Sequence, residues 1–300
     1  MKKFIHKIII FIIPGLLYCL IAIFTMPYLI SLQNGPSTKQ QITLSFKNAL
    51  KRDFQLLILG SSKTYRGLNP DYFELNTFNF SHDNDTFNQT YYKLDFLISK
   101  KKDLKYLILG VDYFSFSFKS DTRNYVYADF LNANYLKDFK NANILTSKID
   151  YYLSNINPKK LLYLQPKNNK PFLRKNGQYI KPGRATEKDF IKRNINRMTF
   201  QEKYFEKTIN LCLANNIKIF IVMLPVRQNE LNSYTNEEIE EFNNFVKTFE
   251  NNKSVFYLNY SINDDFKTKD YTDITHFNEN AANRFSKILN KDIIKLIEKL

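Results

Sequence analysis

Apolar runs of strand length recur along the chain and alternate with helical patterns. The runs lie at 54–59, 77–80, 104–110, 217–224 and 254–260. In four other segments, apolar residues recur at three- and four-residue steps: 87–101, 200–216, 236–252 and 278–300. This spacing predicts amphipathic helices. The runs are continuous rather than alternating, as in strands that are buried on both faces. This order of elements predicts an α/β fold with a central parallel sheet that is covered by helices on both faces.

Two segments depart from this alternation. Residues 32–52 are mostly polar, and we interpret them as a stalk that precedes a domain over 53–300. A stretch at about 118–198, rich in Tyr, Asn and Lys, separates the third and fourth predicted strands. We interpret it as an insertion that either closes over one end of the sheet or decorates the fold without a role in binding. Within it, Asn176–Gly177 predicts a hairpin turn.

The N-terminal segment is apolar over a length that suits a membrane span. No charged residue lies between Lys7 and Lys39, and a spanning helix needs roughly 20 apolar residues. Lys2, Lys3 and Lys7 precede the span, which favours an N-terminus inside the cytoplasm and a domain outside it. Small residues suited to a cleavage site are lacking, so residues 1–31 are interpreted as a cytoplasmic N-terminus and a retained signal anchor.

Net charge and composition indicate less about function than the order of elements does. The formal net charge of +15 favours anionic partners, such as acidic polysaccharide or lipid headgroups. The lysines are scattered rather than gathered in a stripe, which fits a solvated basic surface equally well, and we expect no nucleic-acid partner. The two cysteines, Cys19 and Cys212, lie far apart and indicate neither a disulfide framework nor a metal site.

Candidate chemistry gathers where the predicted strands end. Ligands of open parallel sheets bind beyond the carboxyl ends of the strands. The segments at these ends are GSSKTYR, NFSHDN, GVDYFSF and LPVR, and YTDITHFN precedes the last helix. In the last of these, Asp273 stands three residues before His276. On a tight turn, this spacing lets a carboxylate orient an imidazole and stabilise its protonated form. The alternative makes Asp273 a turn former and His276 a loop residue.

Three of these segments together resemble the SGNH/GDSL hydrolase superfamily: ILGSS, GVDYF and DITHFNENAANRFS. The nearest resemblance is to membrane-anchored members of bacterial envelope-modifying systems, which include alginate O-acetyltransferase-like and D-alanyl-lipoteichoic acid biosynthesis-like proteins. It covers roughly 54–116 and 217–290, outside the insertion. The resemblance implies a three-layer α/β/α sandwich behind one transmembrane helix, in a single-pass protein of the bacterial inner membrane whose domain is extracytoplasmic.

The resemblance also implies roles for individual residues. The Gly-Asp-Ser nucleophile motif of the superfamily falls on Gly60, Ser61 and Ser62, which makes Ser62 the nucleophile. His276 is then the general base and Asp273 the acid that orients it. The alternative role for Ser62 is a helix N-cap, since serine commonly accepts a hydrogen bond from an orphan N–H there.

The oxyanion hole departs from the superfamily pattern. Ser81 stands where the second block supplies a glycine, and Asp112 stands near the position of an asparagine that helps to hold the oxyanion. An ionised carboxylate would repel an oxyanion, so either Asn84 or Asn79 takes the asparagine role or this donor is missing. Loss of one such donor typically costs about 10²–10³ in rate.

Other charged residues near the strand ends have two interpretations each. Arg66 and Arg227 either contact an anionic substrate or are ion-paired with the protein. His82, beside Asp83 and Asp85, could mark a metal site, but one histidine among loop acids is more typical of a polar loop. We therefore expect neither a metal nor a cofactor.

These features together predict an extracytoplasmic serine acyl-esterase or O-acyltransferase, which acts on a cell-envelope glycan or other anionic polymer through an acyl-enzyme on Ser62. The resemblance implies a multispanning membrane acyltransferase as the partner that delivers the acyl group. Two alternatives stay open: a simple carbohydrate deacetylase, and a non-catalytic envelope-assembly or binding protein that keeps the fold.

Overall fold

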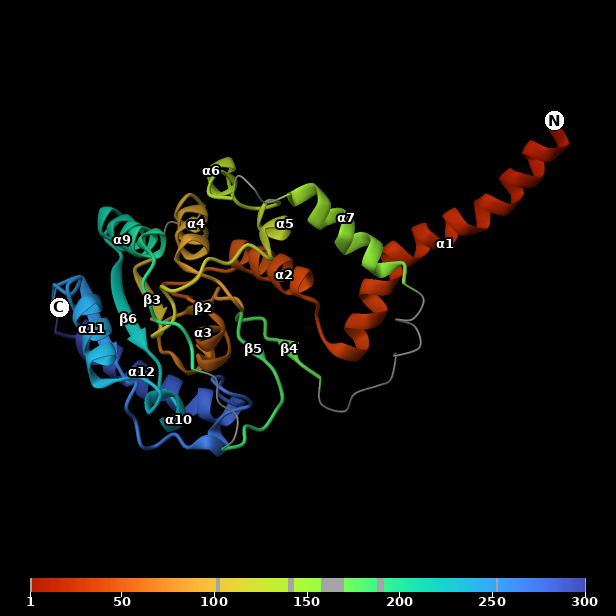
Figure 1. The fold of residues 1–300 in the computed structure, drawn as a ribbon. Helices are drawn as coiled ribbons and strands as arrows, with labels where there is room; N and C mark the ends of the chain where they lie inside the picture. The colour runs from red at the N-terminus through yellow and green to blue at the C-terminus, as the bar shows by residue number, and fades with distance from the viewer. Residues whose placement is uncertain are drawn as a thin grey trace.

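A five-stranded parallel sheet forms the centre of the molecule (Figure 1). The computed structural model describes residues 2–100, 103–139, 143–157, 170–187, 192–251 and 253–299. The strands are β1 (Leu56–Leu59), β2 (Thr77–Asn79), β3 (Tyr106–Val111), β6 (Lys218–Met223) and β7 (Val255–Asn259). They lie in the order β2-β1-β3-β6-β7, and every neighbouring pair is parallel. Each of the five apolar runs therefore coincides with a strand, with β3 extending one residue past its run, and the predicted parallel sheet is confirmed.

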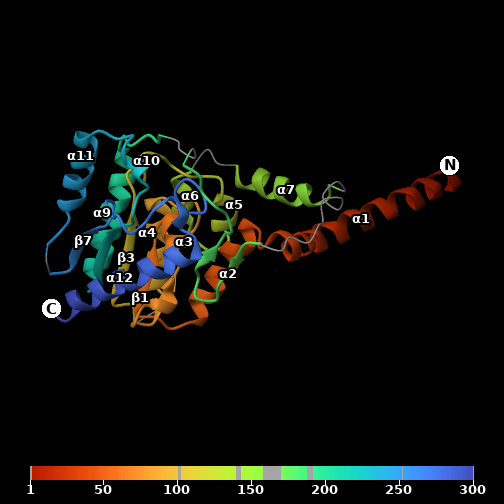
Figure 2. The ribbon, with the colours of Figure 1, turned by 90° about the horizontal axis from the view of Figure 1, so that it is seen from below.

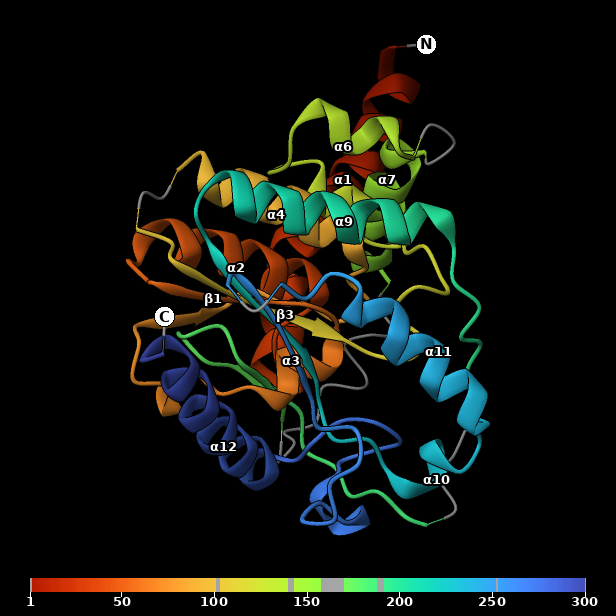
Figure 3. The same ribbon diagram turned by 90° about the vertical axis from the view of Figure 1, so that its left-hand side faces the viewer.

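Helices pack against both faces of this sheet because successive strand side chains point to opposite sides. In β1, Leu57 and Leu59 face one hydrophobic cluster, and Leu56 and Ile58 face the other. The first cluster includes α2 (Thr38–Lys51), α4 (Phe87–Ile98), α9 (Thr199–Ala214) and α11 (Asn236–Lys247). The second includes α12 (Glu279–Ile297). Figure 3 shows α4 and α9 above the sheet and α12 below it, so the four predicted amphipathic helices are confirmed.

The polar stretch 32–52 is not a stalk along its whole length, which corrects our interpretation. Residues 38–51 form α2, whose N-cap Ser37 and Gln40 make a capping box. Ile42, Phe46 and Ala49 recur at four- and three-residue steps and are buried in the first cluster. This short apolar stripe is enough to dock α2, so the folded domain begins before residue 53.

The N-terminal helix α1 (Lys2–Asn34) projects away from the rest of the molecule (Figure 2). Among the described residues it is the one helix that is long and apolar enough to cross a membrane, judged by length and composition. Pro14 and Pro27 lie inside it, which membrane helices tolerate. This agrees with a membrane anchor at the N-terminus.

The insertion between β3 and α9 contributes both helices and a hairpin. The helices in its described part are α5 (Asn124–Tyr127), α6 (Ala133–Lys137) and α7 (Ile144–Asn155), and residues 140–142, 158–169 and 188–191 lie outside that part. β4 (Phe172–Leu173) and β5 (Tyr179–Ile180) pair in an antiparallel way, which confirms the predicted hairpin. Gly177 at its turn has φ +96, where a Cβ would lie 1.8 Å from the carbonyl oxygen of Asn79. The hairpin is thus seated directly against the end of β2.

Candidate active site

The candidate nucleophile lies on a tight turn between β1 and a short helix, α3 (Ser62–Gly67). Gly60 makes this turn with φ +151, and a Cβ there would lie 2.6 Å from Oγ1 of Thr64. Ser61 takes the N-cap position but makes no capping hydrogen bond with its side chain. Ser62 is therefore the first helical residue rather than the cap, and it stands at the carboxyl edge of the sheet.

Three side chains from two distant segments meet at this edge. Oγ of Ser62 lies 2.7 Å from Nε2 of His276, and Nδ1 of His276 lies 2.6 Å from Oδ1 of Asp273. The same Asp273 oxygen accepts hydrogen bonds from the backbone N–H groups of Thr275 and His276, each at 3.1 Å. A hydroxyl, a base and an acid that orients the base, all within hydrogen-bond reach, form the geometry that activates a serine.

The electrostatics of the pair leave the imidazole neutral and the carboxylate charged. Burial lowers the pKa of His276, the hydrogen bond that its imidazole donates to Asp273 raises it and the charge of Arg66 lowers it again, with a net result below its ordinary value. Burial opposes ionisation of Asp273, but the bond with His276 and the backbone N–H donors hold the pKa of this carboxyl well below its usual range. At neutral pH, His276 can therefore accept a proton from Ser62.

The two arginines proposed as substrate contacts are both engaged by the protein. Arg66, which is 8% exposed, places Nη2 at 2.8 Å from Asp83 and Nη1 at 3.5 Å from Asp273. Arg227 is buried, and its guanidinium donates to the backbone carbonyls of Thr186 at 2.8 Å and Ile274 at 3.5 Å. Each arginine thus supports the turn that carries Asp273 and His276.

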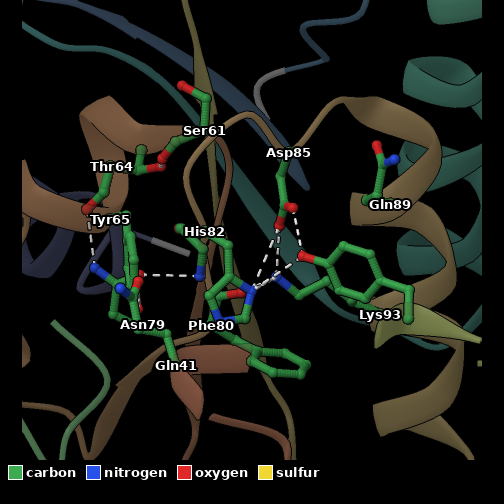
Figure 4. Close-up of polar contacts among 12 residues, drawn as sticks. Gln41, Ser61, Thr64, Tyr65, Asn79, Phe80, His82, Asp85, Gln89 and Lys93 are labelled. Atoms are coloured by element: carbon green, nitrogen blue, oxygen red, sulfur yellow. Dashed lines mark hydrogen bonds and ion pairs between the residues drawn. The ribbon is translucent and has the colours of Figure 1, made fainter. Parts of the chain in front are cut away.

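Two of the oxyanion candidates are occupied by local hydrogen bonds. Nδ2 of Asn79 donates to the carbonyls of Thr64 and Leu68, each at 2.9 Å, and its Oδ1 accepts from the N–H of Ser81 at 3.1 Å. Figure 4 shows Asn79 turned toward Thr64. The side-chain amide of Asn79 thus ties the end of β2 to α3, and the N–H of Ser81 is engaged by Asn79 rather than open toward the site. Asn84 is exposed and has a left-handed φ of 56°.

Asp112 does not face the site as a lone carboxylate. It lies 2.5 Å from Nζ of Lys63, which also lies 3.6 Å from Glu230, and all three side chains are buried. Burial raises the pKa of Asp112, Lys63 lowers it and Glu230 raises it, to about 6. Sequence reasoning missed Lys63 because its two partners come from other parts of the chain.

His82 belongs to a buried network that also includes Asp85 and Lys93 (Figure 4). Its Nδ1 lies 3.1 Å from both the hydroxyl of Tyr127 and Nζ of Lys93. Lys93 donates to Asp85 at 2.7 Å, and Tyr127 donates to Asp85 at 2.5 Å. Burial, followed by the charge of Lys93, lowers the pKa of His82 well below its ordinary value.

The two loop acids beside His82 also diverge. Asp83 pairs with Arg66, whereas Asp85 pairs with Lys93. Among the described residues, no group of three or more His, Cys, Asp or Glu side chains is placed to hold a metal ion. The structure therefore gives no support to the metal interpretation of this loop.

We expect Lys93→Met to lower the free energy of unfolding by about 3–5 kcal/mol, because the carboxylate of Asp85 would stay buried without its cation. Denaturant unfolding of the full chain in detergent measures the loss. Lys148→Met is the matched control. The pair of Lys148 with Asp129 is partly exposed, so its loss should stay within about 1 kcal/mol. Equal losses in the two variants would contradict this account of the buried pair.

The comparisons with known proteins assign no activity. A protein-family model that carries no functional description matches residues 178–298. The matched segment runs from the hairpin through β6 and β7 to α12, so it includes Asp273 and His276 but not Ser62. It covers less than half of the chain and does not show the family. No curated protein matches the chain.

Proposed function

We propose that the chain is a membrane-anchored serine acyl-esterase or O-acyltransferase of the SGNH type, with the three-layer α/β/α architecture of that superfamily. The contact that carries the proposal is the 2.7 Å approach of Oγ of Ser62 to Nε2 of His276, with Asp273 behind the imidazole. The pKa directions of His276 and Asp273 support it, because they leave a neutral base next to an ionised acid.

The chemistry follows from this contact. Ser62 attacks the carbonyl carbon of an ester while Nε2 of His276 takes the hydroxyl proton, and a C–O bond forms. The tetrahedral intermediate then collapses, the bond to the leaving alcohol breaks, and the imidazolium returns its proton to that alcohol. The acyl group remains on Ser62. A second hydroxyl, from water or from a glycan, gives its proton to His276 and attacks the carbonyl carbon of the acyl-enzyme. The bond from that carbon to Oγ of Ser62 then breaks, and the imidazolium returns the proton to Ser62.

The acyl acceptor decides between transfer and hydrolysis. Transfer to a hydroxyl of an envelope glycan or another anionic polymer suits a basic domain held beside the membrane by α1. The partner would be a multispanning membrane acyltransferase, as the resemblance implies. With water as acceptor, the same site is a carbohydrate deacetylase.

A fluorophosphonate probe tests the proposal, because it labels only an activated serine. The full chain in isolated membranes should become labelled, and the adduct should map to Ser62 by mass spectrometry. Protein unfolded before the probe is added is the control and should stay unlabelled. Folded protein that resists the probe would favour a non-catalytic binding protein. That alternative is favoured by one observation: Asn79, the N–H of Ser81 and Asp112 are all bound to other protein groups.

The proposed location gives a further prediction. Lys2, Lys3 and Lys7 precede the span, so residues 40–300 should lie outside the cytoplasm of a bacterial cell, with α1 in the inner membrane. A reporter that is active only in the cytoplasm, fused after Leu300, should be silent. The same reporter fused before Met1 is the control and should be active. A strong signal from the C-terminal fusion would reverse the orientation.

A further inference from the structure

We propose that Arg66 is a positioning residue, which ties the loop after β2 to the turn that carries the base and thereby holds Asp273 against His276. This inference rests on the proposed acyl chemistry. The observation that carries it is the placement of one buried guanidinium between two carboxylates, 2.8 Å from Asp83 and 3.5 Å from Asp273. Since Arg66 lies on the same short helix as Ser62, the bridge joins the nucleophile helix to both loops.

Two residues of the insertion, Gln178 and Tyr179, hold Arg66 in place. Nε2 of Gln178, in the β4–β5 hairpin, donates to the backbone carbonyl of Arg66 at 3.0 Å. The guanidinium lies over the ring of Tyr179, 5.7 Å from its centroid, and that ring stacks on Tyr65 of α3 at 5.3 Å. A planar guanidinium held in this way presents fixed donors to two acceptors, which a lysine ammonium cannot reproduce.

The same insertion segment also reaches the turn of the base. The N–H of Ala185 donates to the carbonyl of Tyr271 at 3.0 Å, and the carbonyl of Thr186 accepts from Arg227 at 2.8 Å. Residues 178–186 therefore contact both α3 and the 271–276 turn. These residues of the insertion thus brace the site rather than decorate the fold.

Removing the charge of Arg66 should act on His276 in a defined direction. The charged groups that influence His276 are Asp273 from its own turn, Arg66 from α3 and Asp83 from the loop after β2; the two carboxylates raise its pKa and Arg66 lowers it. In Arg66→Met the pKa of His276 should rise. Activity requires the neutral base, so the acidic limb of the pH–rate profile should move to higher pH. Asp83→Asn leaves Arg66 on Asp273 and should move the limb to lower pH.

The experiment compares these variants in the full chain by two readouts. The first is the pH dependence of fluorophosphonate labelling. The second is an NMR titration of imidazole protons, which is tractable because the chain has three histidines and which needs no activity; His276→Gln assigns the signal. We expect Arg66→Met to label up to about 10²-fold more slowly than wild type, because small misplacements of reacting groups have effects of this size. Arg66→Lys should keep the wild-type limb but recover only part of the rate.

Arg197→Met is the matched control, because Arg197 also bridges two carboxylates, Glu202 and Glu241, before α9. It should leave both readouts unchanged. If the His276 titration coincides in wild type, Arg66→Met and Asp83→Asn, the inference about Arg66 fails while the proposed function stands. If wild type is not labelled at any pH, the proposed function fails and the inference falls with it. Should Arg66→Met not fold, Asp83→Asn and Arg66→Lys still decide the matter.

Discussion

Ser62→Ala is expected to lower the rate of acyl-ester turnover by about 10⁴–10⁶, the loss that follows removal of a serine nucleophile. The alanine methyl cannot form the acyl bond, and Nε2 of His276 loses the hydroxyl that lies 2.7 Å away. The folded state should change little, because Ser61 rather than Ser62 holds the N-cap position of α3. Turnover of a chromogenic acetyl ester by the purified full chain, together with the melting temperature, measures both effects.

Ser61→Ala is the matched control for this variant. An N-cap serine typically contributes about 0.5–2 kcal/mol to stability, and the side chain of Ser61 makes no capping hydrogen bond, so the loss should lie at the low end. Turnover and probe labelling should stay near those of wild type. If Ser62→Ala keeps its labelling, or loses stability without a specific loss of rate, Ser62 is structural and the proposed chemistry is wrong.

The sheet could be predicted because its signal is local and strong. Each of the apolar runs stands between polar or turn residues, and each coincides with one strand of the sheet to within a residue or two. The stalk interpretation failed for the opposite reason. The stripe of Ile42, Phe46 and Ala49 is only two turns long and is surrounded by polar residues, so the segment as a whole has a polar composition. Only the folded structure shows that this stripe packs into the core.

In the candidate site, too, the local contact could be predicted from the sequence and the long-range contact could not be predicted from spacing. The hydrogen bond from His276 to Asp273 spans three residues, so a turn makes it and the spacing in the sequence indicates it. Ser62 and His276 are 214 positions apart. They could be placed together only through the rule that ligands meet the carboxyl edge of a parallel sheet and through the family resemblance.

The ion-pair partners of the buried charged residues could not be predicted from the hydrophobic pattern. The two partners of Arg66 lie far apart in the sequence: Asp83 is in the loop after β2, and Asp273 is in the turn before α12. The hairpin that supports Arg66 comes from the insertion. Lys93 appears in the sequence as an ordinary helical lysine, yet it is fully buried against Asp85. Such pairings depend on which elements pack together, and neither spacing nor composition encodes that.

His276→Ala is expected to lower turnover by about 10⁴–10⁶ as well, because a serine without its base is left as inactive as a triad without its serine. The variant should fold, since the imidazole is partly exposed at the edge of the sheet and Asp273 keeps its bond to the N–H of Thr275. Combining His276→Ala with Ser62→Ala should add little further loss, because residues that act as one unit are strongly non-additive. Steady-state rates of the two single variants and the double variant measure this.

The matched control is His82→Ala, which separates the two histidines of the domain by the kind of damage that each causes. His82 is 2% exposed and contacts Tyr127 and Lys93. Its removal takes one hydrogen bond from each of these buried groups, which both keep Asp85 as a partner, at a typical cost of about 0.5–1.5 kcal/mol per bond in stability. No described contact joins His82 to Ser62, and the folded fraction of this variant should turn over ester at nearly the rate of wild type. The two variants should therefore differ in opposite ways, with His276→Ala stable and inactive and His82→Ala active and less stable. The reverse order of activities would make His82 the base, and the 2.7 Å contact between Ser62 and His276 would then have no catalytic meaning.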